Sequence, residues 1–340
     1  NGSLVQVNDT AINTGSINYL RNVASLRGFD YIYWSSPVIN QYLGTLYAAP
    51  TAGLKFEWNP IALNPSGSYG FWIPPTSSTM ETGKGYIIRA SSSYGWTGSL
   101  TSTFNGKPNN GVISPTLGRI ANSAIVNDRW NLIGNPYPSS LDAKAFLLEN
   151  AVTKPTIDGY IGLWQHLNAP ASPTSPYYST YQYNYTNDYL IYNRTGPQTQ
   201  NGFNGYVASG QAFFFNLLQE TSPTSSVTFK NAFRNKTFNN SQFLRTSQNE
   251  EGRIWLDLVN SANVPVRALI GYVEDATLER DRLYDAITTI GINNSIHSVI
   301  GSEIFAIQGR PTPFDSDDQV PIGYNATSAG NYKIAIAGVD

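Results

Sequence analysis

The chain has 340 residues, enough for two or three domains with buried cores. Its 21 Lys and Arg nearly balance 23 Asp and Glu, and charged residues make up only 13%, about half the usual share for a soluble domain. No basic stripe is present, which argues against nucleic acid as a partner, and no apolar run approaches the ~18 residues of a membrane span.

Polarity comes instead from Asn, Ser, Thr and Gln, and 22 Tyr, 15 Phe and 7 Trp make the chain unusually aromatic. Cysteine is absent. This composition suits an exported bacterial protein, because an intracellular enzyme of this length would normally keep some thiols and more Lys and Glu. The chain starts at Asn1 without a charged and apolar leader, so we interpret it as a mature or trimmed fragment of a longer protein.

Short aromatic and β-branched runs, each bounded by Gly, Pro, Asn or Ser, predict strands in the first two thirds of the chain. They lie at residues 29–34, 85–89, 129–133, 189–193 and 211–215. A helix is predicted at 140–150, with Ser140 as its N-cap and Asp142 as a favourable charge in its first turn. A further turn or two of helix is predicted at 277–284. Residues 168–186, rich in Pro, Ser, Thr and Tyr, predict a long exposed loop.

The strongest pattern is a duplication. Residues 33–38 (YWSSPV), 82–89 (TGKGYIIR) and 102–107 (STFNGK) are followed about a hundred residues later by 130–138 (WNLIGNPYP), 208–216 (ASGQAFFFN) and 227–231 (VTFKN). In each copy an aromatic strand enters a Pro turn, a glycine turn opens a second strand, and a third strand follows. We therefore expect two β units with the same strand order, and the turns at 83–85 and 210–212 in equivalent positions.

The last hundred residues predict a third unit. Residues 253–260 and 266–273 alternate like half-buried strands and predict a hairpin across 261–263. Residues 332–337 place Tyr332, Ile334 and Ile336 on one face, which predicts a strand that buries this face and pairs with the hairpin. If a parent protein continues past Asp340, the sheet edge near Val339 should be open or covered by a partner.

Together these patterns predict an all-β protein with few short helices. Duplicated β-sandwich or jelly-roll-like units at 1–128 and 129–246 are followed by a third β-sandwich unit at 247–340, truncated at its end.

Three blocks carry a family resemblance: WNLIGNPYPSSLDAKAFL at 130–147, LIGYVEDAT at 269–277 and IFAIQGRPTPFDSDDQVPIGY at 304–324. From about Tyr31 to its end the chain resembles large secreted proteins of the Bacteroidetes, particularly flavobacterial ones, which are exported by the type 9 secretion system. Such proteins generally end in a sorting domain, which is not seen in this sequence. The resemblance implies export through the type 9 translocon and then surface attachment or release, and it does not imply one biochemical activity.

Catalytic motifs are missing from the sequence. His166 and His297 have no His, Cys or carboxylate at ligand spacing, which argues against zinc and favours surface or strand-packed histidines. No Gly-x-Ser-x-Gly elbow, phosphate loop or dinucleotide fingerprint is present. A two-carboxylate hydrolase could use Asp142, Glu149, Asp158 or Asp188, but their spacing gives no reason to prefer any of them. We therefore predict no catalytic residue and no enzyme activity.

Two patterns suggest ligands. Asp315, Asp317 and Asp318 follow one another on an expected loop, and such carboxylates can bind Ca²⁺, with a solvated turn as the alternative. Aromatic residues expected in or near loops could bind sugars or protein surfaces, with small local cores under Trp72 and Trp96 as the alternative. The aromatic ligand-binding candidates are Trp72, Trp96, Trp164, Tyr177, Tyr178 and Tyr181, with Trp58, Tyr183 and Tyr185 nearby. Trp34, Trp130 and Trp255 lie in predicted strands and are expected in the core.

The segment Asp9-Thr10-Ala11 is similar to the acceptor for O-glycosylation in exported Bacteroidetes proteins, with Thr10 as the modified residue. The sequence is therefore interpreted as an extracellular, cell-surface structural or adhesive module. Surface glycans or other surface proteins are its expected partners, besides the translocon during export. The alternative is a carbohydrate-binding module or a glycoside-active enzyme acting on extracellular polysaccharide.

Overall fold

The computed structural model describes residues 2–28, 30–46, 55–65, 67–90, 97–121, 123, 126–165, 189–200, 203–236, 252–288 and 294–340. β-strands, arranged in several sheets, are the main regular structure of these residues, with one short α-helix among them, which confirms the predicted all-β fold. The chain divides into two compact units. Unit 1 comprises residues 1–157, 163–188 and 206–243, and unit 2 comprises 158–162, 189–205 and 244–340. Both copies of the repeat thus contribute to unit 1, and the second copy also supplies two short segments of unit 2.

The strands of the first copy in unit 1 are β1 (Ile17–Arg27), β2 (Tyr31–Trp34), β3 (Lys55–Leu63), β4 (Tyr69–Ile73), β5 (Tyr86–Arg89), β6 (Thr97–Gly106) and β7 (Thr116–Gly118). Those of the second copy are β8 (Trp130–Gly134), β9 (Ser140–Asp142), β10 (Ile161–Trp164, which begins in unit 2), β12 (Tyr206–Val207), β13 (Ala212–Asn216), β14 (Thr224–Ser226) and β15 (Arg234–Asn235). Short helical segments are η1 (Leu43–Thr45), η2 (Val126–Arg129), α1 (Ala143–Leu147), η3 (Leu148–Thr153) and η5 (Asn231–Phe233).

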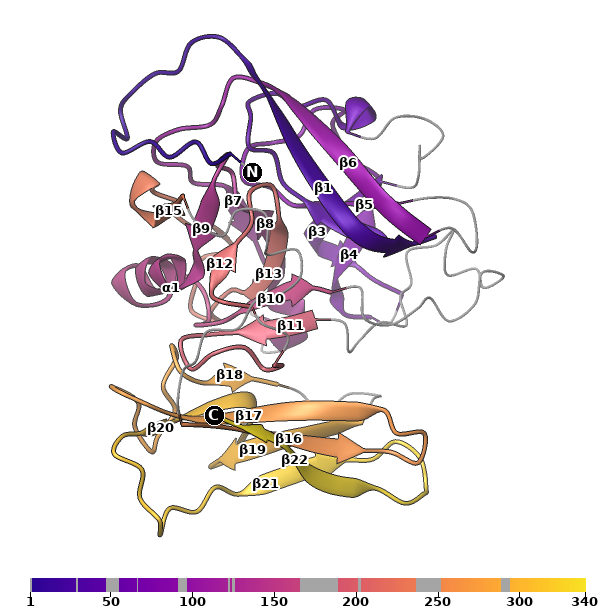
Figure 1. Cartoon of the computed structure of the whole chain (residues 1–340), viewed down its shortest axis with the longest axis vertical. Coiled ribbons are helices and arrows are strands. Elements are labelled where there is room, and N and C mark those ends of the chain that lie inside the picture. Colours follow the sequence, from indigo (N-terminus) through magenta and orange to yellow (C-terminus); the bar gives the residue numbers. More distant parts are fainter. Residues whose placement is uncertain are drawn as a thin grey trace. The chain divides into compact units, whose positions relative to one another are not determined.

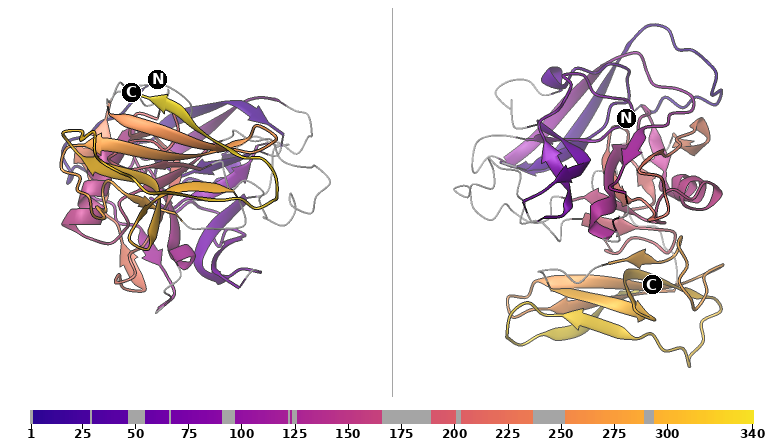
Figure 2. Two further views of the ribbon diagram at one scale, coloured as in Figure 1. Left: turned by 90° about the horizontal axis from the view of Figure 1, so that it is seen from below. Right: turned by 180° about the vertical axis from the view of Figure 1, so that it is seen from behind.

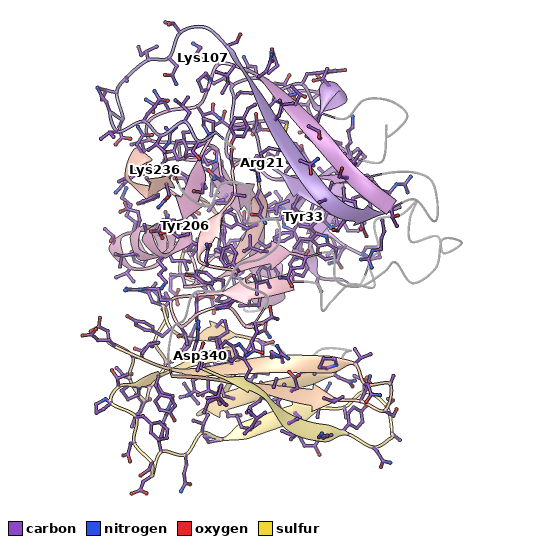
Figure 3. All side chains as sticks on the ribbon, in the orientation of Figure 1. Arg21, Tyr33, Lys107, Tyr206, Lys236 and Asp340 are labelled. Carbon is purple, nitrogen blue, oxygen red and sulfur yellow. The ribbon has the colours of Figure 1, made fainter. Side chains whose placement is uncertain are left out.

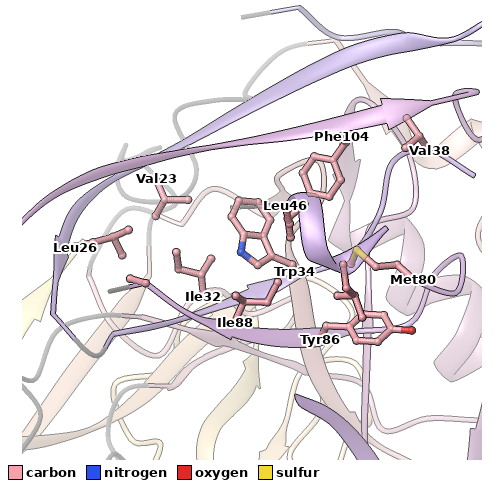
Figure 4. Packing of buried hydrophobic residues seen from close by; sticks show 12 residues of the cluster. Val23, Leu26, Ile32, Trp34, Val38, Leu46, Met80, Tyr86, Ile88 and Phe104 are labelled. Carbon is pink, nitrogen blue, oxygen red and sulfur yellow. The ribbon is translucent and has the colours of Figure 1, made fainter. Parts of the chain in front are cut away.

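The core of the first copy forms around Trp34, which is fully buried (Figure 4). β1 and β6 pair as a long antiparallel ribbon that covers this core (Figure 1). Val23 and Leu26 from β1 and Phe104 from β6 point into it, and the Phe104 ring meets Trp34 edge-on at 5.6 Å. The alternation of buried and exposed residues along β1 is that of a strand with one covered face.

The pairing of three strands is the same in the two copies. β2 pairs antiparallel with β5, and β8 pairs antiparallel with β13. Trp34 lies opposite Tyr86 in the first copy, and Ile133 opposite Phe213 in the second, which is the same register under the repeat alignment. β3 lies beside β5 as β10 lies beside β13, so these three strands have the same order in both copies.

Reciprocal backbone contacts join the copies. The Ser35 N–H donates to the carbonyl of Gly210 at 2.8 Å, and its counterpart Gly134 donates to Gly83 at 3.0 Å. Two isolated bridges repeat this exchange: Trp34 with Gln211, and Lys84 with Ile133. Gly83 and Gly210 have φ of +81° and +71°, a region that other residues rarely adopt. The two glycine turns therefore occupy equivalent positions, as predicted, and each is held against the opposite copy.

The third strands of the copies differ. Residues 102–107 end the long strand β6, whereas residues 227–231 form no strand. Phe229 instead makes an isolated bridge with Ile113, and η5 follows directly. The predicted third strand of the second copy was therefore wrong, because the chain there pairs with the linker between the copies.

The helix after β8 starts later than predicted. Ser140 lies in β9, and the Asp142 carboxylate accepts the Ala145 N–H at 3.1 Å as the N-cap of α1. The helix continues as the π-helix η3, in which Glu149 is held by two lysines. Asp142 is thus a cap and not merely a favourable first-turn charge.

Unit 2 contains β11 (Tyr189–Tyr192), β16 (Arg253–Val259), β17 (Pro265–Val273), β18 (Ala286–Ile287), β19 (Ser295–Ile300), β20 (Glu303–Pro311), β21 (Ile322–Asn325) and β22 (Lys333–Val339). β16 and β17 form the predicted hairpin. The order of the main sheet is β21-β19-β20-β17-β16-β22, with β17 and β20 parallel. β19 is no sheet neighbour of β16 or β17, yet Ile296 shares a cluster with Leu258 and Ala268. The sheet therefore curls over itself into two facing layers (Figure 2).

The predicted final strand is present, but its apolar face is exposed and not buried. β22 pairs antiparallel with β16, as predicted. However, Ile334 and Ile336 are 52% and 68% exposed. The expectation of a buried apolar face was wrong because β22 is the outermost described strand of its sheet, and no second layer covers it within the described part of the chain.

The helical turns predicted at 277–284 were also wrong. This segment forms turns, in which the Asp281 carboxylate accepts the Thr277 N–H and the Asp285 carboxylate accepts the Asp281 N–H. Aspartate side chains compete in this way with the backbone bonds of a helix.

Candidate functional site

A cluster of aromatic rings lies where the two copies meet in unit 1. At its centre Phe214 of β13 contacts Trp58 at 5.1 Å and Trp72 at 5.9 Å, both edge-on. Tyr33 of β2 stacks almost parallel on Trp164 of β10, with ring centroids 5.3 Å apart. The cluster is made by strands of both copies, since β2, β3 and β4 belong to the first and β8, β10 and β13 to the second.

Exposure separates the rings of this cluster into two groups. Tyr33, Trp72 and Phe214 are buried, and Trp72 is only 6% exposed. Trp58, Trp130 and Trp164 are half-buried, and the Trp58 indole N–H donates to the Trp130 carbonyl at 2.7 Å. The exposed parts of these half-buried indoles are apolar aromatic surface, against which a sugar ring can pack. We call Trp58, Trp130 and Trp164 the tryptophan surface.

Of the aromatic residues nominated from the sequence, some are buried in the core and some belong to the tryptophan surface. Trp72 is a core residue and not a ligand-binding one, because it sits in β4 opposite Trp58 and is covered on both sides. Trp58 likewise lies in a strand and not in a loop. Trp164 is on the tryptophan surface. Trp34 and Trp255 are core residues, as expected, whereas Trp130 is only partly buried. Trp96, Tyr177, Tyr178, Tyr181, Tyr183 and Tyr185 lie outside the described residues.

Buried carboxylates in unit 1 are bound to their own chain. Glu57 pairs with Lys84 at 3.1 Å and accepts the hydroxyl of Thr76 at 2.9 Å. Glu149 pairs with Lys230 at 2.6 Å, and this contact lowers the pKa of the Glu149 carboxyl. Asp30 pairs with Arg27 at 3.5 Å. Asp128 accepts the Tyr69 N–H at 2.8 Å and the Ser123 hydroxyl at 2.7 Å.

Unit 2 repeats this pattern. Asp158 pairs with Arg280 at 3.4 Å, and Asp257 pairs with Arg267 through two bonds of 2.6 and 2.8 Å. Asp285 is buried, and no cation of the described residues lies at bonding distance from it. Its two oxygens accept the N–H of Gly309 at 2.8 Å and of Asp281 at 2.6 Å. Burial raises the pKa of Asp285 to about 6, more than these two bonds lower it.

Such contacts also occupy three of the four carboxylates that a two-carboxylate hydrolase could use. Asp142 caps α1, Glu149 is held by lysines, and Asp158 is held by Arg280, while Asp188 lies outside the described residues. The sequence analysis did not nominate Asp285. Its pKa is raised to about 6, as that of a general acid would be, but both of its carboxylate oxygens accept hydrogen bonds from backbone N–H groups. Its signal was the Asp-x-x-x-Asp spacing within the turn-forming segment.

The three aspartates proposed for calcium do not come together. Asp318 forms two bonds to the Arg310 guanidinium and accepts the Tyr272 hydroxyl at 3.0 Å. Arg310 lowers the pKa of the Asp318 carboxyl. Asp315 instead accepts the Asp317 N–H at 2.9 Å in a turn. In the described part of the chain no three His, Asp or Glu side chains gather as metal ligands would. The Asp318 carboxylate is bound by Arg310, eight residues upstream, and Asp315 lies in a turn, which was the alternative weighed for this segment.

The N-terminal segment is held against the second copy. Arg234 is buried, lies over the Tyr137 ring at 4.7 Å, and donates to Asn231 at 2.9 Å and to the Leu4 carbonyl. Burial lowers the pKa of Arg234 to about 10, so it is still charged at neutral pH. Thr10 is exposed in this segment, as O-glycosylation would require, and its hydroxyl donates to Asn8 at 2.8 Å.

The remaining candidates are structural. His297 is buried in β19 opposite Gly323, and burial lowers the pKa of its imidazole, so it is a strand-packed histidine. His166 lies outside the described residues.

No helix in the described ranges has the length and hydropathy of a membrane-spanning helix.

Fold and site together define an all-β protein of two units, one built by duplication and carrying an aromatic cluster between its copies. The chain belongs to the family described as Domain of unknown function (DUF8693), whose model matches residues 1–340. Comparison with curated proteins found no match, and neither did comparison with solved structures.

Proposed function

We propose that this chain is an extracellular surface module with a structural or adhesive role, exported by the type 9 secretion system. The proposal rests first on how its buried carboxylates are used. Asp30, Glu57, Asp128, Glu149, Asp158, Asp257 and Asp285 all bind cations, hydroxyls or backbone N–H groups of the same chain. A catalytic carboxylate must instead face substrate, so this arrangement favours a scaffold over an enzyme.

The scaffold itself supports the same proposal. Two copies joined by reciprocal backbone bonds and a shared aromatic cluster form a rigid body that can present surface. The low content of charged residues and the abundance of Asn, Thr and Tyr are typical of exported surface proteins. The resemblance of residues 130–147 and 304–324 to secreted flavobacterial proteins favours the type 9 route.

Location and activity test the proposal together. Antibodies against the chain should label intact producing cells, and the label should disappear when the type 9 translocon is deleted. Cells lacking the gene should attach less well to surfaces, and the purified chain should release no products from polysaccharides. Retention inside the cell would contradict export, and hydrolysis of a polysaccharide would contradict the scaffold role.

The second candidate is carbohydrate binding, which the tryptophan surface favours. Three half-buried indoles within one cluster offer apolar aromatic surface for sugar rings, and Asn59 and Asn131 each follow one of these tryptophans. In this case the chain would bind polysaccharide without cutting it.

Glycan-array binding separates the two candidates. A carbohydrate-binding module should lose about fivefold in affinity in Trp58→Ala or Trp164→Ala, since an aromatic stacking contact contributes on the order of 1 kcal/mol. Tyr42→Ala is the matched control, because Tyr42 is an exposed aromatic outside the cluster. No binding to any glycan, or equal loss in the control, would leave only the structural or adhesive role.

A further inference from the structure

β1 and β6 of unit 1 form a two-stranded ribbon with two different faces. The inner face covers the Trp34 core, and Val23 and Phe104 point into it (Figure 4). Among the described strands neither β1 nor β6 pairs with any other, so the ribbon is a sheet of its own (Figure 1). The outer face, about 26 Å long at ~3.3 Å per residue, is exposed along most of its length. It carries Asn18, Leu20, Asn22 and Ala24 from β1, and Thr97, Ser99, Thr101, Thr103 and Asn105 from β6.

The outer face of the ribbon bears no charge. β6 contains no Asp, Glu, Lys or Arg, and the only charged residue of β1 before Arg27 is Arg21, which is 1% exposed. Arg27 itself pairs with Asp30 at the end of β1. Exposed strands usually carry charged side chains, Lys above all, because an uncharged strand surface favours unwanted pairing with other chains. The ribbon lacks this common protection, which is explained if its ligand is itself uncharged.

Hydrogen bonds across the ribbon hold the polar side chains of this face in place. Asn22 lies opposite Thr101 and donates to its hydroxyl at 3.0 Å. Asn18 lies opposite Asn105 and accepts a hydrogen bond from its amide. Each group can make further bonds, since an amide has two N–H donors and a carbonyl oxygen, and a hydroxyl both donates and accepts. The face is therefore an ordered row of neutral hydrogen-bonding groups.

The chemistry of this face disfavours most classes of partner. Nucleic acid and acidic polymers require Lys or Arg, and metal ions require carboxylates or imidazoles, none of which the face presents. The centre of a protein interface is rich in aromatic residues, Met and Arg, whereas Leu20 is the only large apolar side chain here, at 62% exposed. A sugar chain without charges matches the face, because its hydroxyls donate and accept hydrogen bonds as Asn, Ser and Thr side chains do.

We propose that the outer face of β1 and β6 binds a neutral polysaccharide chain. The chain lies along the ribbon and forms hydrogen bonds with Asn18, Asn22, Thr101 and Asn105. Leu20, between Asn18 and Asn22, packs against the apolar face of a sugar ring. This site is separate from the tryptophan surface, whose residues lie in β3, β8 and β10. The inference builds on the adhesive role proposed above, because it names what the module adheres to.

Binding of the full chain to insoluble cellulose, starch and β-1,3-glucan tests the proposal, with alginate as the acidic counterpart. Wild type should bind at least one of the three neutral polymers and should not bind alginate. Asn22→Ala/Thr101→Ala should weaken this binding about tenfold, since each lost hydrogen bond should cost roughly threefold. Ser316→Ala/Gln319→Ala removes two exposed uncharged side chains from unit 2, and as the matched control it should bind like wild type. Both double variants should keep the unfolding midpoint of wild type, because all four side chains are exposed.

The outcomes separate this site from the functions proposed above. No binding to any of the three neutral polymers, or equal binding by the two double variants, would overturn the ribbon site. Loss of binding in Trp58→Ala but not in Asn22→Ala/Thr101→Ala would place the polysaccharide on the tryptophan surface, which overturns the ribbon site and supports the carbohydrate-binding candidate. Surface labelling and attachment of intact cells depend on none of these results, so the adhesive role stands or fails separately.

The salt dependence of binding is an independent measurement. Contacts between neutral groups are not screened by salt, so the affinity for the neutral polymer should change less than about twofold between about 0.1 and 1 M salt. A steep fall over this range would show that charged groups carry the binding, and would contradict a neutral ligand on this face.

Discussion

The strand ends of unit 1 and the last strand of unit 2 differ in what covers them. In unit 1, the end of β2 and the turn before β5 lie against the second copy. There the Ser35 N–H donates to the Gly210 carbonyl, and the Gly134 N–H donates to the Gly83 carbonyl. In unit 2, β22 ends beside solvent with its isoleucines exposed. Duplication explains the difference, because two copies of one shape can satisfy each other's edges. Unit 2 has no such copy, and within the described residues β22 remains the outermost strand of its sheet.

The largest effect should come from the closed core of unit 1. Trp34→Ala removes a fully buried ring that Phe104 meets edge-on, and should cost about 3–5 kcal/mol of unfolding free energy. Ile336→Ala on the open edge should change it by no more than about 0.5 kcal/mol in the monomer. Chemical denaturation of both variants measures the contrast. Similar losses would mean that the edge is buried after all and would break the comparison.

A smaller loss is expected at the N-terminal attachment. Arg234→Lys keeps the charge but lacks the guanidinium fork that reaches Asn231 and Leu4 together. Losing charge-assisted bonds in a buried place should cost about 1.5–3 kcal/mol. Hydrogen exchange should become faster at the amides of Leu4 and Asn231, while those of β16 keep their protection. Unchanged exchange at Leu4 would show that the segment is held by other contacts.

The equivalence of the copies can be tested at their glycine turns. Gly83→Ala and Gly210→Ala each force a left-handed backbone on alanine and place a Cβ within 3.1–3.2 Å of a neighbour. Each should cost about 1–2 kcal/mol, and the two losses should agree closely. Gly2→Ala is the control, because its Cβ would meet nothing within 4 Å. A loss confined to one turn would show that the copies have diverged in their structural roles.

The smallest effect is a pH dependence inside unit 2. Because burial raises the folded-state pKa of Asp285 to about 6, above the ordinary value of 3.8, the folded state binds more protons between these values. The contribution of Asp285 to stability is therefore greatest at low pH and falls as pH rises through about 6. Relative to Asp285→Asn, wild type should gain about 1.3 kcal/mol between pH 7 and pH 5. A constant difference between the two proteins would exclude the raised pKa.

The sequence by itself determined the positions of most strands, the duplication and two of the three predicted core tryptophans. These depend on local patterns: aromatic and β-branched runs form strands, Gly83 and Gly210 mark turns with positive φ, and repeated blocks repeat a register. Trp34 and Trp255 lie in such runs and are buried. The hairpin of β16 and β17 followed from alternation in the same way.

Tertiary structure decided which surfaces are covered. Alternation predicts that Ile334 and Ile336 share a face, but burial requires another layer, and that layer is not specified locally. Likewise Trp58 and Trp72 are neighbours because β3 and β4 pair. The Asp318 carboxylate binds Arg310 through a side-chain contact between a loop and a strand, which no local pattern indicated. Side-chain partners are chosen by proximity in space, and a chain brings residues together at distances along the sequence that no local pattern records.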